Sequence, residues 1–170
     1  LAFFPGLNAS PAISPDGRLM LLVLSRDGNP EVYRMAVDGS ELKRLTFTPA
    51  VETSPVWSPD GAQIALVSDQ GGGPQVHLLG ANGGRMRRVS FMGNYATSPD
   101  WSPRGDRIIF TAQIEGTFQL VLLELYLRGG DRAVWIALHV HDRGPIEDPG
   151  RERPGRRSRN RSRSPEARGS

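Results

Sequence analysis

Three copies of one sequence pattern, spaced 44 residues apart, constrain the fold of this chain more than any other feature. The tetrapeptide Ser-Pro-Asp-Gly begins at Ser14 and Ser58, and the variant Ser-Pro-Arg-Gly begins at Ser102. A second Ser-Pro pair precedes each copy at the same spacing, at Ser10, Ser54 and Ser98. A strand-rich repeat of roughly 40–45 residues has the size of one four-stranded propeller blade. We therefore expect a row of equivalent β-sheet units.

The second copy shows most clearly how four strands fit into one repeat. We expect its strands at Pro55–Ser58, Gln63–Ser68, Gln75–Leu79 and Met86–Phe91. The segments between them carry glycine with asparagine or aspartate, which tolerate the positive φ of tight turns. No segment shows a helical period of apolar residues. The predicted fold class is all-β, with propeller blades of four antiparallel strands.

The repeat divides the chain into blades and flanking segments. The predicted parts are a lead-in strand segment at 1–9, blade 1 at 10–53, blade 2 at 54–97, a partial or aberrant blade 3 at 98–141 and a tail at 142–170. Blade 3 loses its register after about residue 122, because its turn glycines are Gly129 and Gly130 instead of positions 127 and 128. We expect an incomplete ring, an open arc in which one blade face or sheet edge stays uncovered.

Arginine, proline, glycine and serine dominate the C-terminal end. Such a segment buries too little apolar area to offset its ordering entropy, so we expect a disordered basic tail. Residues 150–170 hold eight arginines and two glutamates, so the net charge of +3 comes from this end. An RNA-associated protein that acts through the tail is one alternative function. The tail has no aromatic residue that could stack on bases, however, and we expect no specific nucleic-acid partner.

Two tryptophans recur at one point of the repeat. Trp57 and Trp101 are 44 residues apart, and Ile13 takes this position in the first copy. Neighbouring blades bury their faces against one another, so a bulky residue at a fixed position indicates packing between blades. We expect both indoles to be buried, with the Asp-Gly turns exposed.

The residues needed for catalysis or metal binding are sparse. The chain has no cysteine, no G-x-S-x-G nucleophile elbow, no phosphate-binding loop and no H-E-x-x-H motif. His77 holds a strand position that is Tyr33 in the preceding copy, which indicates a packed histidine. His139 and His141 share one strand face, but no third ligand accompanies them. We predict a non-enzymatic protein with no catalytic residues, no cofactor and no metal site.

The repeats resemble the propeller domain of the TolB family, a periplasmic component of the Tol-Pal envelope system. The motifs that carry the resemblance are Trp57–Gly61, Ile64–Asp69, Gly72–His77 and the basic strand ends Lys43–Thr46 and Arg87–Ser90. The resemblance covers about residues 3–121 and implies a six-bladed periplasmic scaffold that does not span the membrane. It also implies a Pal-like lipoprotein and other Tol components as partners. Similar blades form the gate of prolyl-oligopeptidase-type serine peptidases, so such a gate without its catalytic domain is an alternative.

Successive antiparallel strands place the loops of each blade on two opposite rims. Loops between second and third strands share one rim with the connections between blades, here called the loop rim. The Ser-Pro-Asp-Gly turns form the other, the turn rim. Binding residues on rigid scaffolds lie mostly in loops, and Tyr95 is the expected aromatic anchor. The predicted partner-binding residues are Glu52, Thr53, Asp69, Gln70, Asn94 and Tyr95, beside Arg26 and Asp27. Open blade edges could also favour self-association.

Overall fold

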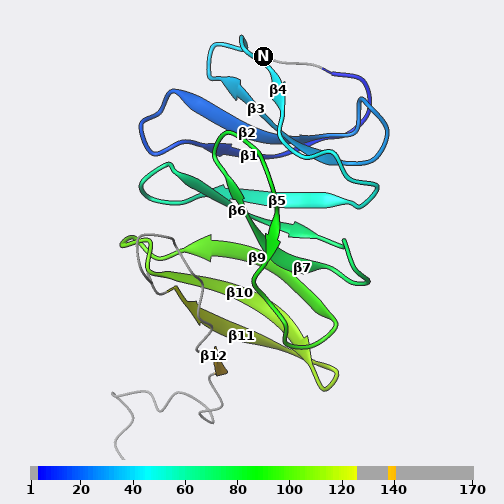
Figure 1. Ribbon diagram of the computed structural model, residues 1–170, viewed down its shortest axis with the longest axis vertical. Coiled ribbons are helices and arrows are strands. Elements are labelled where there is room, and N and C mark those ends of the chain that lie inside the picture. Colours follow the sequence, from blue (N-terminus) through cyan, green and yellow to red (C-terminus); the bar gives the residue numbers. More distant parts are fainter. Residues whose placement is uncertain (1–3, 126–137, 141–170) are drawn as a thin grey trace, which may run out of the picture.

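The computed structural model describes residues 4–125 and the backbone of 138–140, which form three antiparallel sheets of four strands each (Figure 1). Blade 1 contains β1 Asn8–Ile13, β2 Leu19–Leu24, β3 Glu31–Ala36 and β4 Lys43–Arg44. Blade 2 contains β5 Glu52–Trp57, β6 Gln63–Ser68, β7 Gln75–Gly80 and β8 Arg87–Arg88. Blade 3 contains β9 Tyr95–Trp101, β10 Arg107–Ile114, β11 Thr117–Glu124 and β12 Leu138–Val140. The tail predicted at 142–170 lies outside the described residues.

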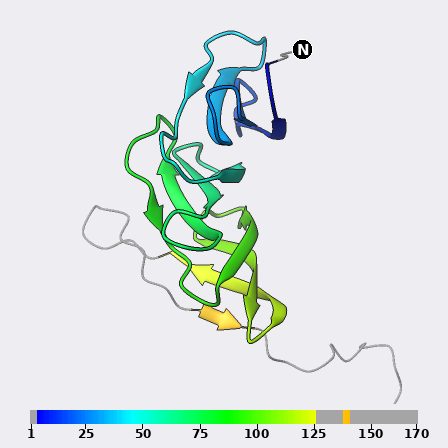
Figure 2. The ribbon, with the colours of Figure 1, turned by 90° about the vertical axis from the view of Figure 1, so that its right-hand side faces the viewer.

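The three blades stack one above the other (Figures 1 and 2). Within each sheet the strand order follows the chain, from β1, β5 or β9 at one edge to β4, β8 or β12 at the other. The described residues contain no helix, and their sheets do not close into a ring. The predicted all-β class, with four-stranded blades in an open arc, is confirmed.

The first strand of each blade contains a bulge at the repeated Ser-Pro pair. β5 spans Glu52–Trp57, whereas the sequence pattern predicts a strand that begins only at Pro55. The pairing of β5 with β6 shifts register between Thr53 and Val56. Ser54 lies in this shift with φ 51°, and its two equivalents in the other blades have φ 50° and 53°. The bulge lets the strand continue on both sides of a proline, which cannot donate a ladder hydrogen bond.

Side-chain hydrogen bonds hold the Ser-Pro-Asp-Gly turns on the turn rim. Ser58 Oγ donates to Asp60 Oδ1 at 2.6 Å. In blade 3, Arg104 stands in the aspartate position, and Ser102 Oγ donates to Asp106 Oδ1 at 2.7 Å instead. This hydrogen bond is the main reason why the pKa of Asp106 lies below its usual range. Blade 3 therefore keeps the turn by using a carboxylate from a later position.

The repeated tryptophans lie in the seams between blades. Trp57 and Trp101 are each 8% exposed, which confirms the predicted packing role. Trp57 packs against Leu21 of blade 1 and donates its Nε1–H to Ala12 O at 3.1 Å. Trp101 Nε1 is buried without a hydrogen-bond partner among the described residues. Ile13, the equivalent residue of blade 1, is 53% exposed, because no described blade precedes it.

Blade 3 departs from the repeat after its first strand. β10 and β11 have eight residues each, against six in the equivalent strands of the other blades. A tight turn at Glu115 and Gly116, both with positive φ, joins them and replaces a longer loop. Val121 of β11 pairs with Val140 of β12, although the 44-residue spacing would place its partner at 132. The fourth strand is therefore reached through a longer connection than in blades 1 and 2.

One face of blade 3 is uncovered and apolar. Ile109 is 41% exposed and Leu120 is 60% exposed, whereas the equivalent Ala65 and Val76 of blade 2 are fully buried in the seam with blade 3. Phe118 adds a further apolar side chain that is 60% exposed. The face that packs against a following blade in blade 2 thus has no such neighbour in blade 3 among the described residues.

Candidate functional site

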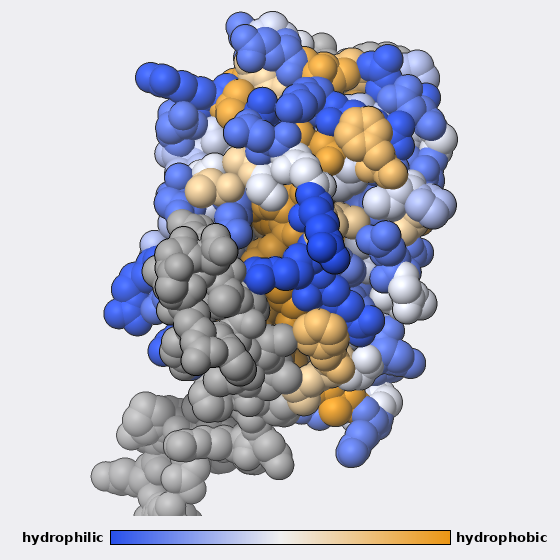
Figure 3. Space-filling view, viewed as in Figure 1, coloured by the Kyte–Doolittle hydropathy of each residue, from blue (hydrophilic) through white to orange (hydrophobic). Residues whose placement is uncertain are grey.

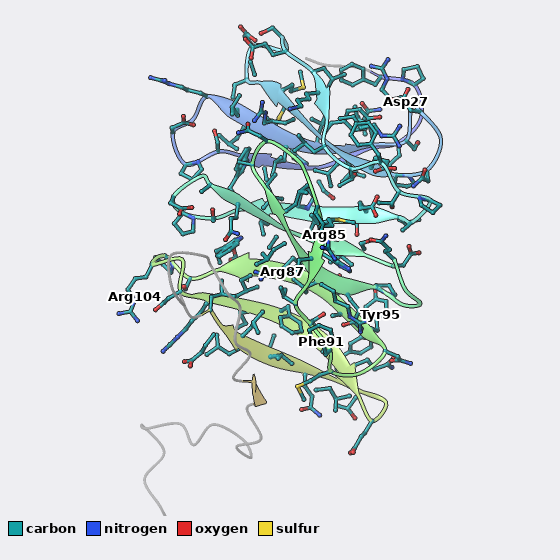
Figure 4. All side chains as sticks on the ribbon, in the orientation of Figure 1. Asp27, Arg85, Arg87, Phe91, Tyr95 and Arg104 are labelled. Atoms are coloured by element: carbon teal, nitrogen blue, oxygen red, sulfur yellow. The ribbon has the colours of Figure 1, made fainter. Side chains whose placement is uncertain are left out.

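The two rims predicted from strand direction lie on opposite sides of the blades. Figure 4 shows Asp27 and Tyr95 on the right, at the loop rim, and Arg104 on the left, at the turn rim. The loop rim consists of residues 25–30 and 69–74 within blades and 45–51 and 89–94 between blades. Because packed antiparallel sheets support both ends of these segments, their side chains are presented from a rigid frame.

Two segments of the loop rim that come from adjacent blades are in close contact. The Ala96 N–H donates to Pro74 O at 2.7 Å, which joins the start of β9 to the loop between β6 and β7. A Cβ added to Gly73 would lie 2.3 Å from Asn94 O, so the backbones touch where only glycine fits. The predicted site residues on these two segments are Asp69, Gln70, Asn94 and Tyr95.

These residues differ in how freely they can reach a partner. Gln70 and Asn94 are exposed, while Asp69 is half-buried. Asp69 Oδ1 accepts a hydrogen bond from the Val51 N–H at 2.8 Å. Asp69 therefore ties its own loop to the connection before β5, and the two amides are the freer polar groups.

Tyr95 is the first residue of β9 and not part of the connection before it. Its ring packs edge-on against Phe118, with centroids 5.9 Å apart and an interplanar angle of 86°. Tyr95 is 38% exposed, and so is Val51, the equivalent residue of blade 2. Because Val51 keeps this exposure in a blade that is covered on both faces, a further blade beyond blade 3 would leave Tyr95 accessible.

Glu52 does not lie on the rim surface as the sequence analysis expects, because its side chain is fully buried. Glu52 Oε1 accepts hydrogen bonds from Thr48 Oγ1 at 2.7 Å and from Ser68 Oγ at 2.8 Å. Thr53 is half-buried in the ladder between β5 and β6, opposite Val67. Side chains alternate between the two faces of β5, which places the Glu52 side chain in the seam with blade 1. Its hydrogen bonds there stabilise the loop rim without exposing the carboxyl.

Glu52 meets a second buried carboxyl, Glu31 of β3, in this seam. Glu31 is 1% exposed, and its Oε1 accepts from Arg44 Nη2 at 2.6 Å and from the Thr48 N–H at 3.1 Å. The Oε2 atoms of both glutamates are buried without a hydrogen-bond partner among the described residues. Burial, together with the nearby Glu31 carboxyl, raises the pKa of Glu52 to about 7. Glu52 therefore keeps its proton up to about neutral pH, and both glutamates hold the connection at 45–51 through hydrogen bonds with Thr48.

The sequence contains only a weak signal for this acid pair. In the 44-residue register, Glu31 aligns with Gln75 and Glu52 aligns with Ala96. Neither position therefore recurs as an acid in the next blade. The pairing depends on the meeting of β3 and β5 from different blades, which the repeat alone does not place.

Arg26 and Asp27 form the part of the loop rim that belongs to blade 1. Arg26 Nε lies 3.6 Å from Asp27 Oδ1, and the Arg26 guanidinium stacks 5.5 Å from the Phe4 ring centroid. Tyr33 Oη donates to Asp27 Oδ2 at 2.5 Å. Burial and this hydrogen bond raise the pKa of Tyr33 to about 12. An un-ionised tyrosine thus anchors the loop between β2 and β3.

The described side chains offer no cluster of metal ligands. Residues 4–125 contain no group of three His, Asp or Glu side chains that could hold a metal ion. His77 is 3% exposed, its Nδ1 lies 3.0 Å from Gln75 O, and burial lowers its pKa, so it is the packed histidine that the sequence indicates. The side chains of His139 and His141 lie outside the described residues. Over the described chain, no helix is long and apolar enough to cross a membrane.

Stacked four-stranded antiparallel sheets with a 44-residue repeat define this chain as part of a β-propeller. The profile of the TolB beta propeller domain family matches residues 1–145. The chain belongs to this family. The match continues past residue 121, where the resemblance noted in the sequence ends, and it includes β12.

Individual relatives agree with this assignment. The chain is 37% identical over 46 residues to the Tol-Pal system protein TolB of Ruthia magnifica subsp. Calyptogena magnifica, which covers 27% of this chain and 11% of that protein. TolB from Acinetobacter baumannii matches with a TM-score of 0.65 and 32% identity, over 71% of this chain and 31% of that one. A puromycin-hydrolyzing peptidase of Mycobacterium tuberculosis matches with a TM-score of 0.57 and 20% identity, over 73% of this chain and 21% of the peptidase, and shows the shared fold alone. The chain thus spans less than a third of either TolB protein.

Proposed function

We propose that this chain is part of a non-enzymatic periplasmic scaffold that binds a Pal-like lipoprotein through the loop rim. The observation that carries the proposal is the contact between the β6–β7 loop and the start of β9, which gathers exposed side chains from two blades. Membership of the TolB propeller family and the similarity to Tol-Pal system protein TolB support the partner class and the compartment.

Tyr95 is the central contact of the proposed interface. Its ring combines a large apolar surface with a hydroxyl, and such side chains dominate the energetics of protein interfaces. The edge-on contact with Phe118 restricts the ring before binding, which lowers the entropy cost of ordering it. Gln70 and Asn94 flank it with amides that can donate and accept hydrogen bonds.

The test compares Tyr95→Ala with Arg104→Ala in the full chain, by calorimetric titration with a purified Pal-like lipoprotein. Arg104 is the matched surface control, because it lies on the turn rim and its side chain is 77% exposed. Loss of a hot-spot aromatic costs about 2 kcal/mol or more, so we expect Tyr95→Ala to weaken binding about 30-fold. We expect Arg104→Ala to bind like the wild type, with circular dichroism confirming that both variants fold.

Two results would count against this proposal in different ways. Equal losses in both variants, or no loss in Tyr95→Ala, would show that the loop rim is not the binding surface. Absence of binding by the wild-type chain would contradict the proposed partner itself.

A further inference from the structure

A groove runs along the outer edge of blades 1 and 2, where the short strands β4 and β8 leave the sheets partly uncovered. It has a volume of about 580 Å³, and its walls are the connection after β4 on one side and β7, β8 and the turn between them on the other. Leu45, Phe47 and Met86 form its apolar lining, and Arg85 and Arg88 its charged lining, while no acidic residue lines it. A second hollow of about 550 Å³ continues past Arg85, Met86 and Arg88.

Figures 3 and 4 show this face of the molecule. Figure 4 labels Arg85, Arg87 and Phe91 on it, and Figure 3 shows hydrophilic side chains in blue beside hydrophobic surface in orange in a hollow. Basic and apolar groups thus meet on one concave surface.

Comparison of the two repeats shows that Arg88 lacks the carboxylate partner of Arg44, its equivalent in blade 1. Arg44 and Arg88 each donate Nε–H to a backbone carbonyl two residues later, at 2.8 and 2.7 Å. Each guanidinium also stacks on the phenylalanine three residues later, at 4.9 and 5.1 Å from the ring centroid. Arg44 then pairs with the Glu31 carboxylate at 2.6 Å. The residue equivalent to Glu31 is Gln75, a neutral amide that accepts a hydrogen bond from Ser90 Oγ at 2.5 Å.

Blade 2 therefore presents an arginine in a fixed orientation without its internal carboxylate. Among the described residues, no carboxylate lies within salt-bridge distance of Arg85 or Arg88. Stacking and the Nε hydrogen bond hold the Arg88 guanidinium in place, so it loses little freedom when it pairs with an external anion.

The apolar wall of the groove provides the second half of a binding site. Phe47 is 73% exposed, more than any other large apolar side chain in the described part of the chain. Aromatic, methionine and arginine side chains are enriched at protein interfaces relative to the remaining surface. The volume of the groove lies within the range of roughly 300–1,000 Å³ that is common for ligand sites.

We propose that this groove binds an acidic segment of a partner protein. A carboxylate of the segment pairs with Arg85 and Arg88, and a neighbouring apolar side chain packs against Phe47 and Met86. Charge complementarity selects this occupant, since the groove combines two arginines with apolar walls and no acid. The groove shares residues 45–48 and 70–71 with the loop rim, but Asn94 and Tyr95 do not line it, so Tyr95→Ala separates this proposal from the proposed function.

The test measures fluorescence anisotropy of a labelled octapeptide that alternates glutamate and phenylalanine, titrated with the full chain. We expect saturable binding that weakens as salt is added, and about tenfold weaker binding for Arg88→Gln and for Phe47→Ala. Arg104→Gln and Phe118→Ala are the matched controls, because both residues are exposed and neither lines the groove. We expect both controls, and Tyr95→Ala, to bind within about twofold of the wild type.

Three outcomes would overturn the proposal. Equal binding of the Gln-Phe version of the peptide would show that no carboxylate is recognised. Equal losses in Arg104→Gln and Arg88→Gln would indicate general attraction to a basic protein. A single-stranded oligonucleotide that binds more tightly than the peptide, without dependence on Phe47, would assign the surface to nucleic acid. Thermal melts of each variant show whether it folds, and the Gln-Phe peptide tests the wild-type chain without any substitution.

Discussion

The buried carboxyl of Glu52 makes the stability of this chain depend on pH in a way that one substitution removes. The folded-state pKa of Glu52 is about 7, against 4.5 in the unfolded chain. Between these values the unfolded chain has released a proton that the folded chain still holds. The free energy of unfolding therefore falls as the pH rises through this window and stays at its lower level above about 7.

The size of this effect follows from the shift. A difference of one pKa unit corresponds to about 1.4 kcal/mol, so Glu52 costs the folded state about 3 kcal/mol above neutral pH. The side chain is fully buried, so solvent screening does not reduce the penalty much. In Glu52→Gln the side-chain oxygen can still accept the hydrogen bonds from Thr48 and Ser68, and its amide can donate to Glu31 without any titration.

The assay is urea unfolding, followed by tryptophan fluorescence, of wild type and Glu52→Gln from pH 4.5 to about 8. We expect the free energy of unfolding of Glu52→Gln to increase relative to that of the wild type as the pH rises, by up to about 3 kcal/mol at about pH 8. The buried His77 acts in the opposite direction, because its lowered pKa makes the folded state lose stability as the pH falls below 6.5. His77 is present in both proteins, so its contribution cancels in the difference between their free energies of unfolding.

The control for a general charge effect is Glu41→Gln, which removes an exposed carboxylate. Its pH profile should run parallel to that of the wild type. A Glu52→Gln profile that also runs parallel to the wild type would refute the assignment of the proton to the buried Glu52.

Three further predictions concern the seams, the bulges and the uncovered face. Trp57→Phe should cost about 1 kcal/mol more than Trp101→Phe in urea unfolding, because Trp57 donates a hydrogen bond to Ala12 O and Trp101 Nε1 has no acceptor among the described residues; equal costs would contradict this. Ser54→Val should destabilise the chain by about 1–2 kcal/mol and Ser54→Gly should not, since Ser54 has φ 51°; two variants of equal melting temperature would argue against strain at the bulge. Leu120→Gln should reduce self-association in sedimentation velocity, because this exposed leucine lies on the uncovered face of blade 3; a wild-type chain that stays monomeric would rule this out.

Part of the candidate site could be predicted because it follows from strand direction. Antiparallel order alone places Asp69 and Gln70 on the same rim as Asn94 and Tyr95, and the structure brings these segments into contact. The exposure of each side chain could not be predicted in this way. Glu52 directly follows a loop-rim connection, so chain order alone places it at the surface. The pleat of β5 instead turns its carboxyl into the seam between blades 1 and 2.

The sequence pattern also could not predict the groove beside Arg88. The basic strand ends recur in the repeat, which indicates equivalent strands. It does not indicate whether each arginine has a carboxylate partner. Whether an arginine is neutralised depends on the residue that faces it from β3 or β7. Only the folded sheets show that Glu31 fills this role for Arg44 and that Gln75 leaves it unfilled for Arg88.

The 44-residue repeat by itself determined the blades, their turns and the burial of Trp57 and Trp101. These features depend on local turn chemistry and on packing between identical units, so they recur wherever the sequence recurs. The tertiary structure alone decided contacts that the repeat does not contain: the Glu31–Glu52 pair between blades 1 and 2 and, within blade 3, the hydrogen bond from Ser102 to Asp106 and the place of β12. Such contacts join residues that the 44-residue spacing does not relate, and the Glu31–Glu52 pair forms only when the seam between blades 1 and 2 closes.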